Sequence, residues 1–123
     1  MWLFTKYGFF SATCAREGDG AHHRPIDPAR IMVRARAREH LEALQRRFTD
    51  LLAGCAIFES TGTDYKYRLF VSKPTWTKIA AEMAAETDYD NFKGEVADHV
   101  DVVGRAYESA LHDVWGVMLR LQK

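Results

Sequence analysis

The sequence predicts an α+β domain in which antiparallel strands alternate with helices. Apolar and polar residues alternate in "IMVRARA", as they do in a half-buried strand. Two further β-compatible runs, "CAIFES" and "YKYRLFVSK", flank the turn-type connector "TGTD", which predicts a hairpin. Between and after these runs, apolar residues recur at helical spacing. Antiparallel hairpins with helices between them are typical of the α+β class.

The opening "MWLFTKYGFFS" predicts one strand over residues 1–14, central or near-central in the sheet because both of its faces carry aromatic side chains. Gly8 in its middle predicts a bulge or a close approach of another part of the chain. A signal peptide is not expected, because no basic leader precedes the apolar stretch and Lys6 interrupts it.

A loop is expected next, over residues 17–30, because "REGDGAHHRPIDPAR" is rich in glycine, proline and charge. Such long connections are often flexible or functional. The strand over 31–37 follows, with Val33 and Ala35 on one face and Arg34 and Arg36 on the other.

Four helical segments complete the chain. Helices are expected over 38–53, from Pro74 onward, around Phe92, and from about Val102 to the end. The order is therefore β-β-α-β-β-α-α-α in a single domain, 1–123. We expect a four-stranded antiparallel sheet with the helices packed on one face, a layout like a circularly permuted ferredoxin-like fold. That likeness concerns the fold and carries no function.

Composition and charge narrow the class of protein. With 123 residues, 47% hydrophobic and 28% charged, the chain suits one globular domain. No apolar run approaches the roughly 20 residues of a membrane-spanning helix, and the expected location is the cytoplasm. The net charge is zero, so no strong nonspecific affinity for nucleic acid follows. The charges are unevenly placed, however, with an arginine-rich first part and an acidic stretch over 82–101.

Few residues form a pattern that predicts chemistry. The chain has no nucleophile elbow, phosphate-binding loop or dinucleotide fingerprint, so no cofactor is expected. His22 and His23 lie near Asp19 and Asp27, but adjacent histidines do not have the spacing of a zinc site, and no metal is expected. The two cysteines, Cys14 and Cys55, are expected to be free thiols.

The candidate binding surface is a sheet face rich in arginine and tyrosine. "RARAR" puts Arg34 and Arg36 on one strand face, and guanidinium groups suit phosphate or carboxylate. "YKYRLFV" interleaves aromatic and basic residues, as nucleic-acid-binding sheets do, but lacks their glycine-aromatic motif. The predicted contact residues are Arg34, Arg36, Tyr65, Tyr67, Arg68, His22 and His23. The two histidines come from the loop over 17–30, which we expect to gate this face.

Three alternatives remain open for these residues. The arginines can form a solvated face paired with the acids of 82–101, either in the same chain or in a second copy. They can also contact a protein partner or a nucleic acid; a protein partner or self-association is favoured, and no membrane contact is expected. The rival class is a small hydrolase or nuclease that uses His22 or His23 as general base, with arginine and tyrosine holding a phosphate. The sequence leans toward a binding module without catalysis.

Four phrases carry a family resemblance: "MWLFTKYGFFS", "MVRARAREHLEAL", "GTDYKYR" and "TDYDNFK". Together they resemble a group of small bacterial proteins of unassigned function, over nearly the whole chain apart from the region around residues 17–30. The resemblance implies a bacterial, cytosolic, single-domain protein. It implies no activity, and therefore no catalytic residue.

Overall fold

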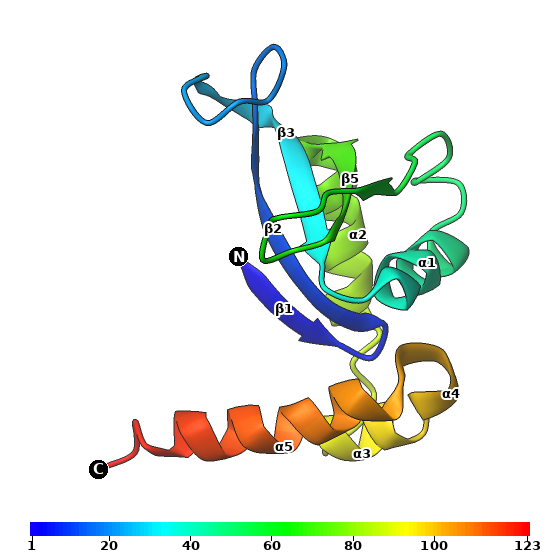
Figure 1. Cartoon of the computed structure of the whole chain (residues 1–123). Helices are drawn as coiled ribbons and strands as arrows, with labels where there is room; N and C mark the ends of the chain where they lie inside the picture. The colour runs from blue at the N-terminus through cyan, green and yellow to red at the C-terminus, as the bar shows by residue number, and fades with distance from the viewer.

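The computed structural model describes all 123 residues and has the expected α+β architecture (Figure 1). Five strands form one antiparallel sheet in the order β1-β2-β3-β5-β4, so the expected count of four strands is wrong. No helix is both long enough and apolar enough to cross a membrane. The strands and helices are β1 (Trp2–Thr5), β2 (Gly8–Arg16), β3 (Ile26–Ala35), α1 (Arg38–Arg47), β4 (Phe58–Glu59), β5 (Tyr67–Ser72), α2 (Lys73–Ala85), α3 (Phe92–Ala97), α4 (Val100–Val103) and α5 (Arg105–Leu119).

The fifth strand arises because the opening segment folds back on itself. Thr5 pairs with Gly8 across a two-residue turn, and the Thr5 hydroxyl donates to the Gly8 carbonyl oxygen over 2.9 Å. Because the turn reverses the chain, counting alternate residues from β1 into β2 no longer predicts which side chains share a face of the sheet. Phe4 consequently stacks on its partner Phe9, with 4.6 Å between ring centroids. Strand β1 lies at the edge of the sheet, and β2 lies between β1 and β3.

The connection between β2 and β3 is shorter than the expected loop over 17–30. Strand β3 begins at Ile26, which leaves residues 17–25 as the connection. The register shifts from Cys14–Ile31 to Ala15–Asp27, so residues 28–30 have no partner in β2, although Arg30 pairs with Ser72 of β5. Pro28 fits here because it has no N–H to donate. Its proline and glycine content made this stretch resemble a loop, whereas pairing with β2 makes part of it a strand.

Helices α1 and α2 cover one face of the sheet and form the main core with it. Pro74 stands in the first turn of α2, as expected, and the Ser72 hydroxyl caps that helix by accepting from the Thr75 N–H. The buried residues of this core are Phe10, Ala12, Ile31, Val33, Ala35, Leu41, Leu44, Phe48, Leu52, Leu69, Val71, Trp76 and Ile79.

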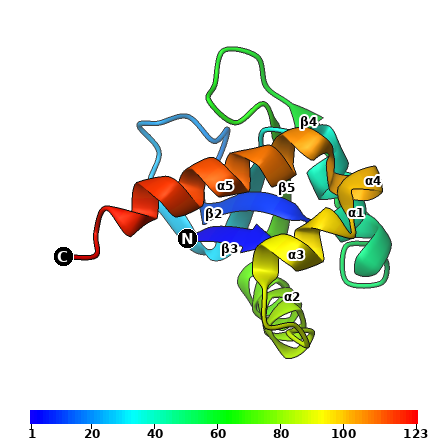
Figure 2. The ribbon, with the colours of Figure 1, turned by 90° about the horizontal axis from the view of Figure 1, so that it is seen from below.

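Helices α3, α4 and α5 form a second, smaller core and lie below the sheet (Figures 1 and 2). Phe9 packs on this second core, whereas its neighbour Phe10 belongs to the main core. Successive side chains of a strand point to opposite faces. The expectation that all helices pack on one face is therefore wrong. The buried residues of the second core are Val96, Val103, Tyr107 and Leu111.

One buried histidine joins the two cores. His40 of α1 is 6% exposed, and its Nδ1 accepts from the Phe9 N–H over 3.3 Å. Its Nε2 therefore carries the proton and donates to the Val103 carbonyl oxygen over 3.1 Å. Burial lowers the pKa of His40, which keeps the ring neutral. A second bond, from the Tyr107 hydroxyl to the Thr5 carbonyl oxygen, fastens α5 to the β1–β2 turn.

Gly8 makes room for this histidine. Its φ is +138°, and a Cβ atom added to it would lie 2.2 Å from His40 Cγ. The close approach expected from the sequence at Gly8 is therefore present, although the glycine ends a turn rather than interrupting a strand. Any side chain here would displace the His40 ring.

We predict that Gly8→Ala destabilises the protein by about 3 kcal/mol or more, because the new methyl group overlaps the His40 ring. The measurement is urea unfolding. Gly62→Ala is the matched control: its φ is +82° but nothing lies within 4 Å of the added Cβ. The control should lose only about 1–2 kcal/mol, from backbone strain alone. Equal losses would contradict the role given to His40.

We also predict that stability falls as the pH is lowered from about 7.5 to about 5.5. The pKa of His40 is lowered in the folded protein, so the unfolded chain binds a proton that the folded chain does not. Stability is therefore complete above the ordinary histidine pKa of about 6.5 and is lost below it. Urea unfolding at several pH values measures the slope. His40→Gln should remove most of it; a slope unchanged in that variant would assign it to other groups.

Candidate functional site

The sheet face turned away from α1 and α2 carries a concavity of about 970 Å³. Its floor comes from β2, β3 and β5, and its walls come from the connections before β3 and before β5. Figure 2 shows these two connections rising from the side of the sheet opposite α2. We call this concavity the arginine pocket, after four lining residues: Arg16, Arg30, Arg34 and Arg68.

Two of these arginines face each other at the centre of the sheet. Arg34 of β3 and Arg68 of β5 are direct cross-strand partners, so their side chains share a face. Arg34 donates to the Ser11 hydroxyl over 2.7 Å, and Arg68 donates to the Thr63 hydroxyl over 3.0 Å. The Nε atoms of both arginines are buried without a hydrogen-bond partner. Like charges placed opposite each other are unfavourable in a sheet.

No carboxylate neutralises the arginine pocket from within the chain. The ion pairs of the molecule, with nitrogen and oxygen within 4.0 Å, involve other cations, and none includes the four pocket arginines. Two acids do stand in the lining, Asp19 and Asp64, but Asp19 pairs with Arg24 outside the pocket. The lining therefore holds four arginines against two acids, and none of the four arginines is in an ion pair, which leaves an excess of positive charge.

Tyr65 lies beside the arginine pocket and orders its rim. Tyr65 is 4% exposed, and the guanidinium groups of Arg34 and Arg36 each lie 4.6 Å from its ring centroid. Arg36 also donates to the Asp64 carbonyl oxygen over 3.1 Å. Tyr65 precedes β5, so its side chain does not follow the alternation of that strand. It therefore lies on the same face as Arg68. Its stacked arrangement holds both arginines in cation–π contact.

The predicted contact residues are only partly brought together. Arg34, Arg68 and His22 line the arginine pocket, and Arg36 and Tyr65 pack at its edge. Tyr67 does not contribute, because its side chain packs against the main core on the other face. His23 is exposed and is not part of the lining.

The connection over 17–25 supplies one wall of the pocket through residues that include Asp19 and His22. Asp19 accepts from the Ala21 N–H over 3.1 Å and from Arg24 Nε over 3.4 Å. His22 makes no hydrogen bond to either acid of the lining. A histidine, carboxylates and arginines thus share one concavity, but no acid orients the histidine as a general base requires.

Several lining residues escaped sequence reasoning. Arg30 shares the alternation of Met32 and Arg34 but lies within the stretch expected to be a loop, and Arg16 lies beyond the expected end of its strand. Phe70 also lines the pocket, with the Arg30 guanidinium 4.2 Å above its ring centroid. Extending the alternation of "IMVRARA" backward by one residue would have found Arg30.

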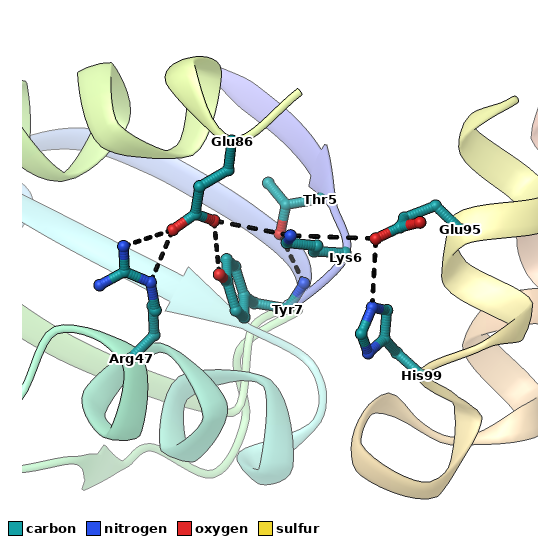
Figure 3. A network of polar contacts seen from close by, with 7 residues as sticks. All are labelled: Thr5, Lys6, Tyr7, Arg47, Glu86, Glu95 and His99. Atoms are coloured by element: carbon teal, nitrogen blue, oxygen red, sulfur yellow. Dashed lines mark hydrogen bonds and ion pairs between the residues drawn. The ribbon is translucent and has the colours of Figure 1, made fainter. Parts of the chain in front are cut away.

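Two acids of 82–101, Glu86 and Glu95, belong to a network in a different part of the molecule (Figure 3). Glu86, at the end of α2, accepts from the Tyr7 hydroxyl over 2.5 Å and from Arg47 Nε over 2.6 Å. Lys6 lies between Glu86 and Glu95, at 3.8 and 3.9 Å, and Glu95 also contacts His99 four residues later in the chain. Burial and the Glu86 hydrogen bond raise the pKa of Tyr7 to about 12.

This network joins the β1–β2 turn to α1, α2 and α3. It also decides one of the alternatives left open by the sequence. Within the chain, Arg34 and Arg36 do not pair with the acids of 82–101, because those in the network contact Lys6, Arg47 and His99 instead.

Comparison with protein-family models, with curated proteins and with solved structures returns no match. The resemblance to a group of small bacterial proteins therefore stays a prediction.

We predict that Tyr7→Phe destabilises the protein by about 1 kcal/mol, because Glu86 loses one donor but keeps Arg47 and Lys6. Urea unfolding at neutral pH measures the difference. The raised pKa means that the tyrosine's contribution is complete below its ordinary value of about 10 and is lost as the pH rises through about 12. Tyr89→Phe is the control, since Tyr89 donates no such bond; an equal loss there would contradict the assignment.

Proposed function

We propose that this protein is a small binding module that holds a single-stranded nucleic acid in the arginine pocket. The observation that carries the proposal is the pair Arg34 and Arg68, directly opposite on neighbouring strands, lining an open concavity, and without a carboxylate partner. Phosphate groups of the ligand would contact the arginines, and a base would stack on the aromatic residues at the β5 side.

The charge arrangement supports an anionic ligand. Two cross-strand arginines with buried Nε atoms raise the free energy of the unliganded protein through repulsion and incomplete solvation. An anion placed between them offsets the repulsion. The planar guanidinium group donates in a fork that matches phosphate oxygens, so phosphate is the natural counter-charge.

The aromatic residues beside the arginines favour a nucleic acid over a simple anion. Phe70 lines the pocket, and Phe58 of β4 lies next to it with 5.9 Å between ring centroids. Phe58 is 54% exposed, so part of its surface is free for stacking. Positive grooves with exposed aromatic residues are how proteins bind single strands with little sequence preference.

The topology agrees with this proposal. Without β1, the sheet runs β2-β3-β5-β4, and α1 and α2 cover one face. This is the order of a circularly permuted ferredoxin-like sheet, and we infer that relation for the fold. Sheets of the RNA-recognition type bind on their helix-free face, which is where the arginine pocket lies. The analogy concerns the fold and the face that is left open.

We further propose a cytoplasmic location and no membrane contact. Both Cys14 and Cys55 are free thiols, which suits a reducing compartment. The resemblance to small bacterial cytosolic proteins agrees with this. A protein partner for the same face remains the alternative, because carboxylates on a partner can also meet a guanidinium fork.

The test is fluorescence anisotropy with labelled single-stranded RNA and DNA and with a duplex of the same sequence. We expect salt-sensitive binding that favours the single strands, with a log–log salt slope of about −0.7 for each phosphate contacted. Arg34→Gln and Arg68→Gln should each weaken binding about tenfold and lower the slope by about one contact.

The matched control is Arg38→Gln, which removes an arginine of α1 that pairs with Glu42 and does not line the pocket. This variant should bind like the wild type. Phe58→Ala should weaken binding without changing the salt slope, because stacking releases no counterion. Binding that is absent at low salt, or that ignores Arg68→Gln, would overturn the proposal.

A cleavage assay on the same oligonucleotides distinguishes the binding module from the hydrolase or nuclease alternative. Incubated oligonucleotides are run on a denaturing gel, with the wild type and with His22→Ala. We expect intact oligonucleotide in both, since His22 has no acid to orient it as a general base. Cleavage that disappears in His22→Ala would instead assign a nuclease.

A further inference from the structure

The outer edge of β1 carries backbone groups that no other strand pairs. Met1 and Ala12 form a hydrogen-bonded pair: the Met1 ammonium donates to the Ala12 carbonyl oxygen over 3.0 Å, and the Ala12 N–H donates back over 2.9 Å. In an antiparallel ladder such pairs alternate with pairs whose backbone groups point away from each other. Counting from Met1 along the register, the N–H and C=O groups of Trp2 and Phe4 therefore point to the outer edge.

Two observations agree with this assignment. Phe9 is the cross-strand partner of Phe4, and its N–H donates to His40 rather than to β1. Outside the β1–β2 ladder, no hydrogen bond involves the backbone of Trp2 or Phe4. Two donors and two acceptors, alternating along the edge as a strand requires, are therefore free to pair.

The two edges of the sheet differ in how they resist pairing. The far edge, β4, has only two residues, Phe58 and Glu59, and Glu59 pairs with Lys66 over 3.1 Å. Short and charged edge strands prevent the addition of another strand. The sequence of β1, "WLFT", has no charge, no proline and no bulge, and Trp2 is 70% exposed. The β1 edge therefore lacks the usual protection.

An apolar notch lies on each side of the β1 edge. The α2 notch, of about 280 Å³, lies between β1 and α2, and its lining includes Leu3 and Ala84. The α5 notch, of about 430 Å³, lies between β1, the start of α3 and α5, and its lining includes Phe92 and Trp115. Phe4 lines both notches, so they meet at the strand. Figure 2 shows β1 between α2 and α5.

We propose that the β1 edge binds an extended peptide segment of another protein, which adds a sixth strand to the sheet. The peptide backbone pairs with the free N–H and C=O groups of Trp2 and Phe4. Successive side chains of a strand point to opposite faces, so two neighbouring apolar side chains of the peptide enter the α2 notch and the α5 notch. Strand addition takes its affinity from backbone hydrogen bonds and its specificity from such side-chain pockets.

A short segment fits this edge better than a second copy of the chain. Strand β1 has four residues, whereas a standard interface between folded proteins takes about 20–30 residues from each side. A second copy that paired through its own β1 would also bring its own α2 and α5 against the same two helices. A single extended chain needs only the spacing of one strand, about 4.8 Å.

Amide hydrogen exchange followed by NMR tests whether the β1 edge is free. In the protein alone, we expect the N–H groups of Trp2 and Phe4 to exchange at least about tenfold faster than that of Leu3, which pairs with Phe10 in the ladder. Protection of Trp2 and Phe4 without any peptide would show that the edge is already covered, for example by a second copy, and would overturn the proposal.

The binding experiment selects ligands from a displayed library of random peptides and measures the Kd of labelled winners by fluorescence anisotropy. We expect winners with neighbouring apolar residues, and we expect their binding to protect the N–H groups of Trp2 and Phe4 from exchange. A library that yields no ligand, or ligands that leave both N–H groups unprotected, would contradict strand addition.

Two variants at one position separate the backbone from the side chain. Trp2→Pro removes the outward N–H together with the indole, whereas Trp2→Ala removes the indole alone. Proline is tolerated at the first residue of an edge strand, so the fold should be kept, as circular dichroism would check. We expect Trp2→Pro to bind the selected peptides at least about fivefold more weakly than Trp2→Ala. Equal binding by the two variants would overturn the proposal.

Filling a notch tests the side-chain pockets. Ala84→Phe fills the α2 notch, and Ala85→Phe is the matched control, because Ala85 is exposed and does not line it. We expect the first variant to bind the peptides at least about tenfold more weakly and the second to bind like the wild type. Arg34→Gln should also bind them like the wild type, because the arginine pocket shares no lining residue with either notch. Loss of binding in Arg34→Gln, or none in Ala84→Phe, would place the peptide elsewhere.

Discussion

The contact between His40 and Gly8 is the constraint on which the arrangement of the two cores depends. The imidazole can lie against the β1–β2 turn only because position 8 has no side chain. From there its two nitrogens reach backbone groups of β2 and of α4, elements far apart in the sequence. Both bonds require the neutral ring, which burial favours. His40 thus hydrogen-bonds to both sides of the junction between the two cores, next to the bond from the Tyr107 hydroxyl to the Thr5 carbonyl oxygen.

The alternation of apolar and charged residues along β3 and β5 makes the two faces of the sheet chemically different. Val33, Leu69 and their neighbours face α1 and α2, so that side is closed by apolar packing. Arg34 and Arg68 face the other way, where no helix covers the centre of the sheet. The second core covers only the end of that face, at Phe9. The open remainder becomes a concavity because the connections before β3 and β5 rise on either side of it.

The distribution of charge explains why the concavity stays positive. Acids that could have neutralised the arginines are held elsewhere: Glu86 and Glu95 meet Lys6, Arg47 and His99 around the β1–β2 turn. A chain with no net charge therefore contains a local cationic site. The neutral total and the local excess are compatible, because electrostatic binding depends on charges within about a Debye length of the ligand.

Sequence periodicity by itself determined the α+β class, the apolar sides of β3, β5 and the helices, and the shared face of Arg34 with the residues two positions away. These follow from local geometry, since strands repeat every two residues and helices about every 3.6. The tertiary structure decided the strand bounds, strand pairings and side-chain groupings that depend on residues distant in the chain. It split the opening segment at Gly8, paired residues 26–30 into β3, and separated Tyr67 from Tyr65. It also placed Arg16, Arg30 and Phe70 beside Arg68, because register between strands and the conformation of turns are set by packing across the sheet, which a single strand's pattern does not record.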